Sequence, residues 1–342
     1  MTIANKKDEA AMSNSAFHIH FESRRQANPV FQITQERVEE ALARRPDVAD
    51  RVRVTVGRDL EIFDKSMKTA KMLVGFYFPR ERLMNGAPIL EGIQLTGAGL
   101  EALAPFDWVP EGVRLFNNGG VHSRKASEFI TMAVLMLNSR TPSLINAQQK
   151  CEWKPIYTGS CAGKTLLVVG MGKLAAEGAA ICKRLGMVVV GIRRSGEPHP
   201  NCDRTVPPCA LHDEIPLADI ILLTMPATLE TTRMIGAREI SLMKRGTSLI
   251  NFARGNVLDH EALREALVSG HLAGAVLDVF DQEPLPSSSS LWETPNLFVS
   301  PHCASDDVDL YMPQTLDIAL ENAWRLMEGR EPVNLFDPLA GY

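Results

Sequence analysis

From residue 163 onward, short apolar runs alternate with helical stretches, and this alternation constrains the fold more than any other feature. The runs are KTLLVVG, MVVVGI, DIILLTM, TSLINFA, AGAVLDVF and LFVSPH. Strands that are apolar on both sides need helices on both faces of their sheet, and a helix between consecutive strands makes those strands parallel. The sequence therefore predicts a Rossmann-type, doubly wound parallel sheet in the second half of the chain.

A smaller α/β unit precedes this region. AFHIHF is typical of a strand, QERVEEALARRP of a helix with a proline stop, and VRVTV, AKMLVGF, GIQLTGAG and VRLFNN of further strands. These elements predict a mostly parallel sheet in a flavodoxin-like domain. His18 and His20 alternate with apolar neighbours. We therefore interpret them as the outward face of an edge strand rather than as ligands.

The remaining helical segments set the expected domain boundaries. Residues 123–150 form a long helical stretch that is interrupted at Thr141 and Pro142, which suits a connector between domains. The last amphipathic helix ends near Gly329, and we expect it to cross back to the first domain. The fold class is then α/β, with the Rossmann-type sheet inserted in the smaller domain. The expected parts are a disordered tail (1–16), a substrate-binding domain (17–122 plus 308–342), a connecting helix (123–150) and a dinucleotide-binding domain (151–307).

Composition excludes several classes of partner. The net charge of -5 and the pI near 6.0 argue against nucleic acid. The polar N-terminus lacks the apolar core of a signal peptide, and no apolar run approaches the roughly 18 residues of a membrane span. We therefore expect a cytoplasmic protein with no membrane and no metal. The cysteines show no C-x-x-C spacing, and we expect buried, reduced thiols at Cys151, Cys161, Cys182, Cys202, Cys209 and Cys303.

A glycine-rich turn follows the first apolar run directly and opens a helical stretch. Its residues are Gly170, Met171, Gly172, Lys173, Leu174 and Ala175. In the pattern G-x-G-x-x-G/A the first glycine permits a tight turn and the second lets the backbone approach a pyrophosphate. The third position, here Ala175, keeps the helix close to the sheet. Because the helix N-terminus also presents N–H groups to phosphates, we predict a dinucleotide site at residues 170–174.

The end of the next apolar run bears on the choice of dinucleotide. About 20 residues beyond the glycines, NAD-binding units place Asp or Glu on the ribose hydroxyls. This chain has Arg193 and Arg194 there instead. Two arginines suit the 2′-phosphate of NADP and can stack on the adenine. The alternative is a pair of solvated surface arginines, so we expect NADP to be preferred and keep NAD open.

Three separated polar residues follow the ends of consecutive apolar runs. They are Arg254 in ARGNVLD, Glu283 in DQEPLP and His302 in SPHCAS. The carboxyl ends of parallel strands converge on one crevice, so we expect these side chains to lie together. An arginine fork matches a substrate carboxylate, and a histidine can exchange a proton with a carbonyl oxygen near neutral pH. A carboxylate beside that histidine holds the ring and favours the imidazolium form.

These segments together resemble the D-isomer-specific 2-hydroxyacid dehydrogenases, particularly their glyoxylate/hydroxypyruvate reductase branch. The matching text includes GKTLLVVGMGKLAAEGA, LMKRGTSLINFARGNVLDHEAL, LVSGHLAGAVLDVFDQEPLP and SPHCAS, with IQLTGAGLEAL and FNNGGVHS in the first domain. The resemblance implies that NADPH or NADH reduces a small 2-oxo acid, such as glyoxylate or hydroxypyruvate, to the D-2-hydroxy acid. The alternative is a dinucleotide-sensing binding protein that resembles a transcriptional corepressor.

The resemblance also assigns residues and a partner. It implies that Ala98 and Gly99 offer backbone amides to the substrate carboxylate opposite Arg254, and that Asp278 bonds the nicotinamide carboxamide. The alternative for Asp278 is a strand-end carboxylate with local turn contacts only. Further implied dinucleotide contacts are Met225, Pro226, Thr231, Ala253 and His302. The expected partner is a second copy of the chain, held through the apolar helix at residues 129–137, although that helix could equally be internal core.

Overall fold

The computed structural model describes residues 16–338, and these separate into two compact units. Residues 16–121 and 307–338 form the small unit, and residues 122–306 form the large unit. The sequence therefore passes into the large unit once and returns once. The tail expected over residues 1–16 lies outside the described residues, except for Ala16.

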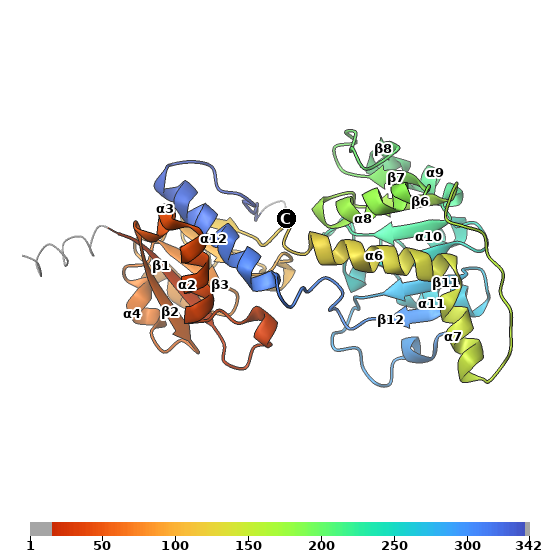
Figure 1. The fold of residues 1–342 in the computed structure, drawn as a ribbon, viewed down its shortest axis with the longest axis horizontal. Helices are drawn as coiled ribbons and strands as arrows, with labels where there is room; N and C mark the ends of the chain where they lie inside the picture. Colours follow the sequence, from red (N-terminus) through yellow and green to blue (C-terminus); the bar gives the residue numbers. More distant parts are fainter. Residues whose placement is uncertain (1–15, 339–342) are drawn as a thin grey trace, which may run out of the picture. The chain divides into compact units, whose positions relative to one another are not determined.

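The small unit is a five-stranded parallel sheet with helices on both faces (Figure 1). Its strand order, β2-β1-β3-β4-β5, is that of flavodoxin-like folds, as expected. The strands are β1 (Phe17–Ser23), β2 (Val52–Arg58), β3 (Met72–Gly75), β4 (Gly92–Leu95) and β5 (Arg114–Phe116). The helices are α2 (Gln35–Arg44), α3 (Pro46–Ala49), α4 (Phe63–Met67), α5 (Leu83–Gly86) and α12 (Tyr311–Met327). Short 3-10 turns lie at η1 (Pro29–Phe31), η2 (Arg80–Arg82) and η3 (Glu101–Leu103).

Local sequence explains where the helices of this unit begin and pack. Thr34 caps α2 by accepting a hydrogen bond from the Arg37 amide, and Pro46 prevents the helix from continuing. Helix α12 lies against α2, and its apolar face joins the same core as β1 and β3. The prediction that the last helix returns to the first domain is confirmed.

The prediction that His18 and His20 lie on an exposed edge is wrong. Strand β1 pairs with β2 on one side and β3 on the other, so β2 is the edge strand. Both histidines are buried, and their ring nitrogens bond to the Thr55 and Thr69 hydroxyls and to Glu22. The alternation of polar and apolar residues in β1 therefore reflects a buried polar ladder rather than a solvent-facing side.

The large unit is a seven-stranded parallel sheet of order β12-β11-β10-β9-β6-β7-β8. Its strands are β6 (Thr165–Val169), β7 (Val188–Ile192), β8 (Arg204–Val206), β9 (Ile220–Leu223), β10 (Ser248–Asn251), β11 (Gly274–Leu277) and β12 (Leu297–Val299). The six apolar runs of the sequence are the strands other than β8, which has no apolar run of its own to predict it. The order reverses on either side of β6, so the glycine turn after β6 lies at the switch point where doubly wound sheets bind ligands.

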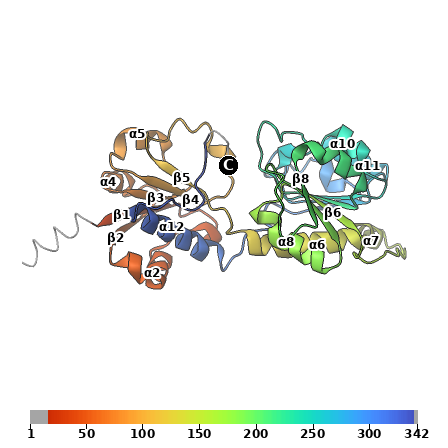
Figure 2. The same ribbon diagram turned by 90° about the horizontal axis from the view of Figure 1, so that it is seen from above.

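Helices cover both faces of this sheet (Figures 1 and 2). The helices are α6 (Ser123–Asn138), α7 (Thr141–Gln149), α8 (Lys173–Arg184), α9 (Leu211–Glu214), α10 (Ala237–Leu242) and α11 (His260–Val268). Helices α6 and α8 lie side by side over one core, whereas α9, α10 and α11 contribute to the other core. Short 3-10 turns lie at η4 (Pro208–Ala210), η5 (Ile215–Leu217), η6 (Gly255–Val257) and η7 (Ser290–Glu293).

The stretch predicted as a connecting helix belongs to the large unit. Its interruption is confirmed, because Arg140 adopts a left-handed backbone and Pro142 begins α7. The buried side of α6 packs on α8, where Ile130 lies against Gly178. Packing, rather than sequence position, therefore assigns residues 123–150 to the dinucleotide half of the chain.

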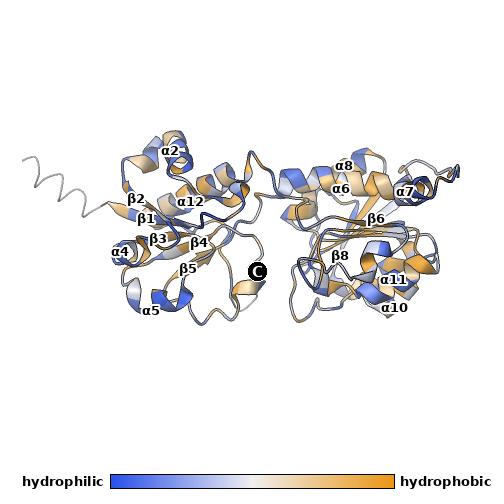
Figure 3. Cartoon of the chain, turned by 90° about the horizontal axis from the view of Figure 1, so that it is seen from below, coloured by the Kyte–Doolittle hydropathy of each residue, from blue (hydrophilic) through white to orange (hydrophobic). Residues whose placement is uncertain are grey.

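Burial broadly follows the hydropathy of the chain, but three of the cysteines depart from it. Figure 3 shows apolar residues along the strands and hydrophilic residues on helices such as α2 and α11. All six cysteines are free thiols. Cys161, Cys182 and Cys202 are buried as expected, whereas the expectation is wrong for the other three, which are exposed.

Candidate active site

The three predicted catalytic residues lie at one edge of the seven-stranded sheet. Arg254 follows β10, Glu283 follows β11 and His302 follows β12, and these strands are neighbours in the parallel sheet. Their carboxyl ends therefore point to the same edge.

His302 and Glu283 form a direct pair. The Nδ1 atom of His302 lies 2.6 Å from Oε2 of Glu283, and the other carboxylate oxygen accepts a hydrogen bond from the Phe280 amide at 2.9 Å. Both side chains are partly exposed, at 45% and 36%. A carboxylate can only accept from Nδ1–H, so the pair leaves Nε2 as the ring atom for proton exchange with a ligand.

The loop that carries Arg254 is fixed by close backbone contact and by a buried amide. A Cβ on Gly255 would lie 2.0 Å from the Phe280 carbonyl carbon, so only glycine lets this loop pass beside the loop of Glu283. Asn251, buried at the end of β10, accepts from the Ala253 amide and donates to the Arg254 carbonyl. Asn251 is not among the residues predicted for the site, although a polar residue that ends a buried strand is a usable signal.

The loop that carries His302 is held in a less common backbone conformation. His302 has φ +49°, in the left-handed region that non-glycine residues rarely adopt. The Ser300 amide bonds to the Leu277 carbonyl at 2.8 Å, and the Cys303 amide bonds to Asp278 Oδ1 at 3.3 Å. Hydrogen bonds on both sides of His302 therefore define its position.

Asp278 makes local turn contacts, and its contact with the nicotinamide carboxamide stays a prediction. Its side chain is buried, and burial raises the pKa of its carboxyl, while Ser300 and the Cys303 and Ala304 amides oppose that rise by bonding to it. The carboxylate therefore connects the end of β11 to the histidine loop.

A second titratable pair, which is not among the predicted site residues, lies beside this loop. His122 Nδ1 lies 3.3 Å from the Ser305 carbonyl oxygen and 3.5 Å from Asp306 Oδ1. Burial lowers the pKa of His122, and the charges of Arg254 and His302 lower it further, while Asp306 opposes both. Burial raises the pKa of Asp306. His122 lies in FNNGGVHS, one of the segments that resemble the family. No pattern in the sequence, however, indicates that residue 122 contacts residue 306.

The glycine turn fits a dinucleotide pyrophosphate. Gly170 has φ +96°, and a Cβ there would lie 2.4 Å from the Met225 nitrogen, so the protein's own packing requires this glycine. Gly172 differs, because a Cβ there would meet only the Gly170 carbonyl oxygen, at 3.9 Å. Open space at the start of α8 is what a close-approaching phosphate needs, and no side chain among the described residues caps this helix.

The other residues expected to contact the dinucleotide differ in how far they are buried. The Met171 amide bonds to the Ile192 carbonyl, and the Met171 side chain is buried. Met225 and Ala253 are also buried. Pro226 is exposed, and its carbonyl accepts from the Thr231 hydroxyl at 2.7 Å, which holds the loop after β9.

Arg193 and Arg194 follow the end of β7, next to the glycine turn. The Arg193 amide bonds to the Val206 carbonyl and its side chain is half-buried. The Arg194 side chain is exposed, and Nη2 lies 4.0 Å from a carboxylate oxygen of Glu230, itself 83% exposed. An exposed pair of this kind is weak.

Ala98 and Gly99 belong to the small unit. They follow the carboxyl end of β4 and are half-buried, and the adjacent Gly97 carbonyl accepts from the Asn118 amide at 3.0 Å. They therefore lie on the loop edge of their own sheet.

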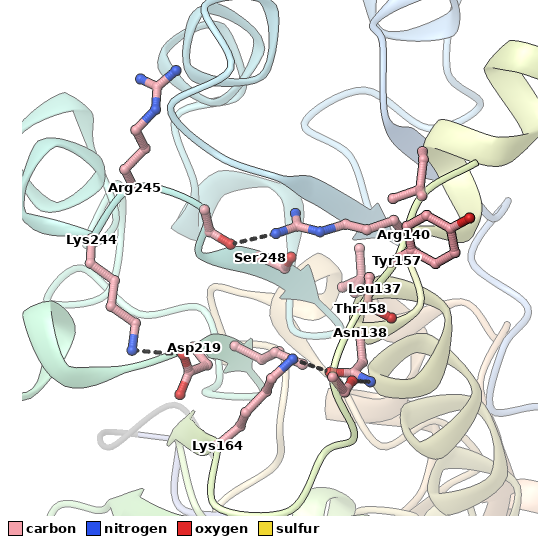
Figure 4. A pocket seen from close by; sticks show the side chains of 14 residues that line it. Leu137, Asn138, Arg140, Tyr157, Thr158, Lys164, Asp219, Lys244, Arg245 and Ser248 are labelled. Atoms are coloured by element: carbon pink, nitrogen blue, oxygen red, sulfur yellow. Dashed lines mark hydrogen bonds and ion pairs between the residues drawn. The ribbon is translucent and has the colours of Figure 1, made fainter. Parts of the chain in front are cut away.

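A separate hollow of about 360 Å³ lies at the opposite edge of the large sheet (Figure 4). Lys164, Asp219 and Ser248, which line it, stand at the amino ends of β6, β9 and β10. Lys164 bonds to Asn138 and Lys244 pairs with Asp219. This hollow is thus remote from the strand ends that carry the candidate catalytic groups.

Within residues 16–338 there is no group of three or more His, Cys, Asp or Glu side chains arranged to hold a metal ion. In the same range, no helix combines the length and the apolar character needed to cross a bilayer.

The doubly wound sheet with its glycine turn, together with the histidine–carboxylate pair at the strand ends, defines a dinucleotide-dependent dehydrogenase. Residues 131–304 match the family model of the D-isomer specific 2-hydroxyacid dehydrogenase NAD-binding domain. The chain therefore belongs to the D-isomer specific 2-hydroxyacid dehydrogenases, which are NAD(P)-dependent oxidoreductases.

Named relatives agree with this assignment. The chain is 31% identical to a glyoxylate reductase of Korarchaeum cryptofilum and 29% identical to one of Aeropyrum pernix, each match covering 74% of this chain and 78% of the relative. A D-isomer specific 2-hydroxyacid dehydrogenase of Xanthobacter autotrophicus Py2, solved with NADPH and MES, is 28% identical with a TM-score of 0.83 and covers 96% of this chain and 100% of that one. These similarities give no support to the corepressor alternative.

Proposed function

We propose that the chain reduces a small 2-oxo acid, such as glyoxylate or hydroxypyruvate, to the D-2-hydroxy acid, with NADPH as the preferred reductant. The observation that carries the proposal is the 2.6 Å contact between His302 Nδ1 and Glu283, at the same sheet edge as Arg254. Two of the named relatives are glyoxylate reductases, which favours a short substrate.

Each residue of the proposed set has a distinct task. The guanidinium of Arg254 binds the substrate carboxylate in a bidentate fashion, and the Ala98 and Gly99 amides bind the same group. His302 donates the Nε2 proton to the carbonyl oxygen as the alkoxide develops, and takes it back in the reverse reaction. Glu283 stabilises the imidazolium form and fixes the ring by accepting from Nδ1–H. When bound, the reduced nicotinamide supplies the hydride.

The glycine turn and the two arginines would hold the dinucleotide. The space at Gly172 and the uncapped start of α8 suit the pyrophosphate. Arg193 and Arg194 suit a 2′-phosphate, and the Xanthobacter relative was solved with NADPH. Met225, Pro226, Thr231 and the carbonyl of Met171 are further proposed contacts. Asp278, which also holds the histidine loop, is a further proposed contact, to the nicotinamide carboxamide.

One experiment tests the proposal directly. The purified chain is assayed with glyoxylate, hydroxypyruvate, pyruvate and phenylpyruvate, each with NADPH and with NADH, and the product is separated on a chiral column. We expect the highest kcat/KM with NADPH and a two- or three-carbon acid, and a D product. An L product, or no oxidation of either dinucleotide with any acid, contradicts the proposal.

We also propose that the chain acts in the cytoplasm as a homodimer. The buried side of α6 packs on α8, which leaves Met132 and Leu135 exposed at 38% and 40%. Trp153 and Tyr157, on the segment after α7, are 97% and 94% exposed. Large apolar side chains exposed on one unit favour contact with a second copy. Sedimentation equilibrium tests this, and a mass of about 38 kDa at micromolar concentration contradicts it.

A further inference from the structure

His122 and Asp306 stand at the two ends of the large unit's sequence, yet their side chains meet. His122 directly precedes α6, and Asp306 ends the loop that begins after β12. They are the first and last residues of the unit, so their contact closes it. Both side chains are largely buried, at 17% and 23% exposure.

The geometry of the contact identifies the donor. His122 Nδ1 lies 3.3 Å from the Ser305 carbonyl oxygen, and a carbonyl can only accept. Nδ1 therefore carries a proton, and the same proton faces Asp306 Oδ1 at 3.5 Å. One ring nitrogen thus binds both the backbone and the side chain of the loop's last two residues.

That loop also carries His302, and its other hydrogen bonds involve the residues that directly follow β12. Ser300 is bonded to the end of β11, Cys303 to Asp278, and His302 itself to Glu283. Beyond Cys303, the Ala304 amide also bonds to Asp278, and the Asp306 amide makes a long bond, 3.4 Å, back to the Cys303 carbonyl. Ala304 packs in the core that α6 and α8 share, and the contact with His122 adds a polar link between the end of the loop and the start of α6.

We propose that His122 is a positioning residue for His302, which it holds in place by fastening the far end of the histidine loop to the start of α6. Asp306 adds a negative charge near the His302 ring. The inference rests on the proposed function, since it concerns the geometry of the proton donor in the same reaction. His122 does not contact the reacting atoms in this scheme.

Asp306 also acts on His302 through its charge, separately from its contact with His122. The groups that act on His122 are Asp306, Arg254 and His302, and those that act on Asp306 are His122 and His302. Because burial lowers the pKa of His122 below its ordinary value of 6.5, this ring is neutral near pH 7. An ionised Asp306 would attract the imidazolium of His302, the form that donates the proton in 2-oxo acid reduction.

The first test compares two substitutions of His122. His122→Asn keeps an N–H donor at nearly the same place as Nδ1, whereas His122→Leu removes it at similar volume. We expect His122→Leu to lower kcat by about 10- to 30-fold with KM changed less than about threefold, and His122→Asn to retain at least about a third of kcat. Near-normal kcat in His122→Leu overturns the proposal. So does a rise in KM at unchanged kcat, which would place His122 on the substrate.

The second test uses Asp306→Asn and a readout that does not need turnover. We expect the basic limb of the kcat/KM profile for reduction to move down by about half a pH unit in Asp306→Asn, and to stay in place in His122→Asn. Nitrogen NMR of the His302 ring should show the Nδ1–Glu283 hydrogen bond weakened in His122→Leu and intact in His122→Asn. An unmoved limb and an unchanged ring spectrum refute the inference.

The two proposals fail in different ways. If the wild-type chain turns over no 2-oxo acid, the proposed function fails, and the ring spectrum still tests whether His122 positions His302. If the wild-type chain is active and His122→Leu matches it, only the positioning role fails. Melting curves of each variant check that the chain remains folded.

Discussion

Oε2 of Glu283 lies 2.6 Å from Nδ1 of His302, and Oε1 of the same carboxylate accepts from the Phe280 amide. One carboxylate thus joins the histidine to the backbone after β11. The ring is held at one nitrogen and presents the other, which is the arrangement a general acid needs.

Removing the acid should slow the chemical step more than it weakens binding. We expect His302→Ala to lower kcat for 2-oxo acid reduction by about 10²- to 10⁴-fold, while KM changes little. Glu283→Gln should cost less, because an amide still holds the ring but does not stabilise the imidazolium. Steady-state kinetics measure both, with the NADPH dissociation constant as control. A His302→Ala variant with near-normal kcat would overturn the assignment.

Arg254 should act mainly on the substrate carboxylate. We expect Arg254→Ala to lower kcat/KM by about 10³-fold, with a large rise in KM, and Arg254→Lys to lower it by about 10- to 100-fold. Lysine keeps the charge but not the two-pronged geometry. Initial rates over a range of 2-oxo acid concentrations measure this. Equal kcat/KM in Arg254→Lys and the wild type would show that bidentate binding does not matter here.

The two glycines of the turn should respond differently to substitution. Gly172→Val fills space that the protein leaves open, so we expect dinucleotide affinity to fall by at least about 30-fold with a melting temperature within about 3 °C of wild type. Gly170→Ala forces a Cβ against Met225 in a left-handed backbone, so it should destabilise the fold itself. Fluorescence titration with NADPH and thermal melts separate the effects. Tight NADPH binding by Gly172→Val would place the pyrophosphate elsewhere.

The arginine pair should decide between the two dinucleotides. We expect the Arg193→Ala/Arg194→Ala double variant to raise KM for NADPH by about 10- to 100-fold and to change KM for NADH by less than about threefold. The physical reason is that only NADPH carries the 2′-phosphate. Parallel kinetics with both dinucleotides provide the measurement. Equal losses with both would mean that the arginines stack on the adenine without reading the phosphate.

Acid should destabilise the small unit through His18. Burial and the neighbouring Arg53 lower its pKa from 6.5 to about 4. The unfolded chain then binds more protons than the folded chain between these values, so stability falls as pH decreases from 6.5 to about 4 and is unaffected above 6.5. The loss is at most ~3 kcal/mol. Urea unfolding at pH 7 and pH 4.5 measures it, and His18→Gln should flatten the dependence. An equal loss in that variant would assign the effect to other groups.

Much of the architecture was predictable because it depends on local pattern. The apolar runs became strands β6, β7, β9, β10, β11 and β12, the glycine turn followed β6, and Thr141 and Pro142 marked the break between α6 and α7. The order of Arg254, Glu283 and His302 after consecutive runs was enough to place them at one sheet edge. Each of these inferences needs only periodicity and the rule that parallel strands end together.

Contacts between distant residues decided the rest. Periodicity cannot show which strand is central, so the burial of His18 and His20 appeared only when β1 was found between β2 and β3. Asp278 accepts a hydrogen bond from the Cys303 amide in the histidine loop. Helix α6 belongs to the large unit because its apolar side packs against α8. The sequence by itself determined the class of fold and the chemical groups of the proposed reaction. Only the tertiary structure decided how those groups are held. His122 and Asp306 are 184 positions apart in the sequence, and a local pattern cannot predict a contact over that separation.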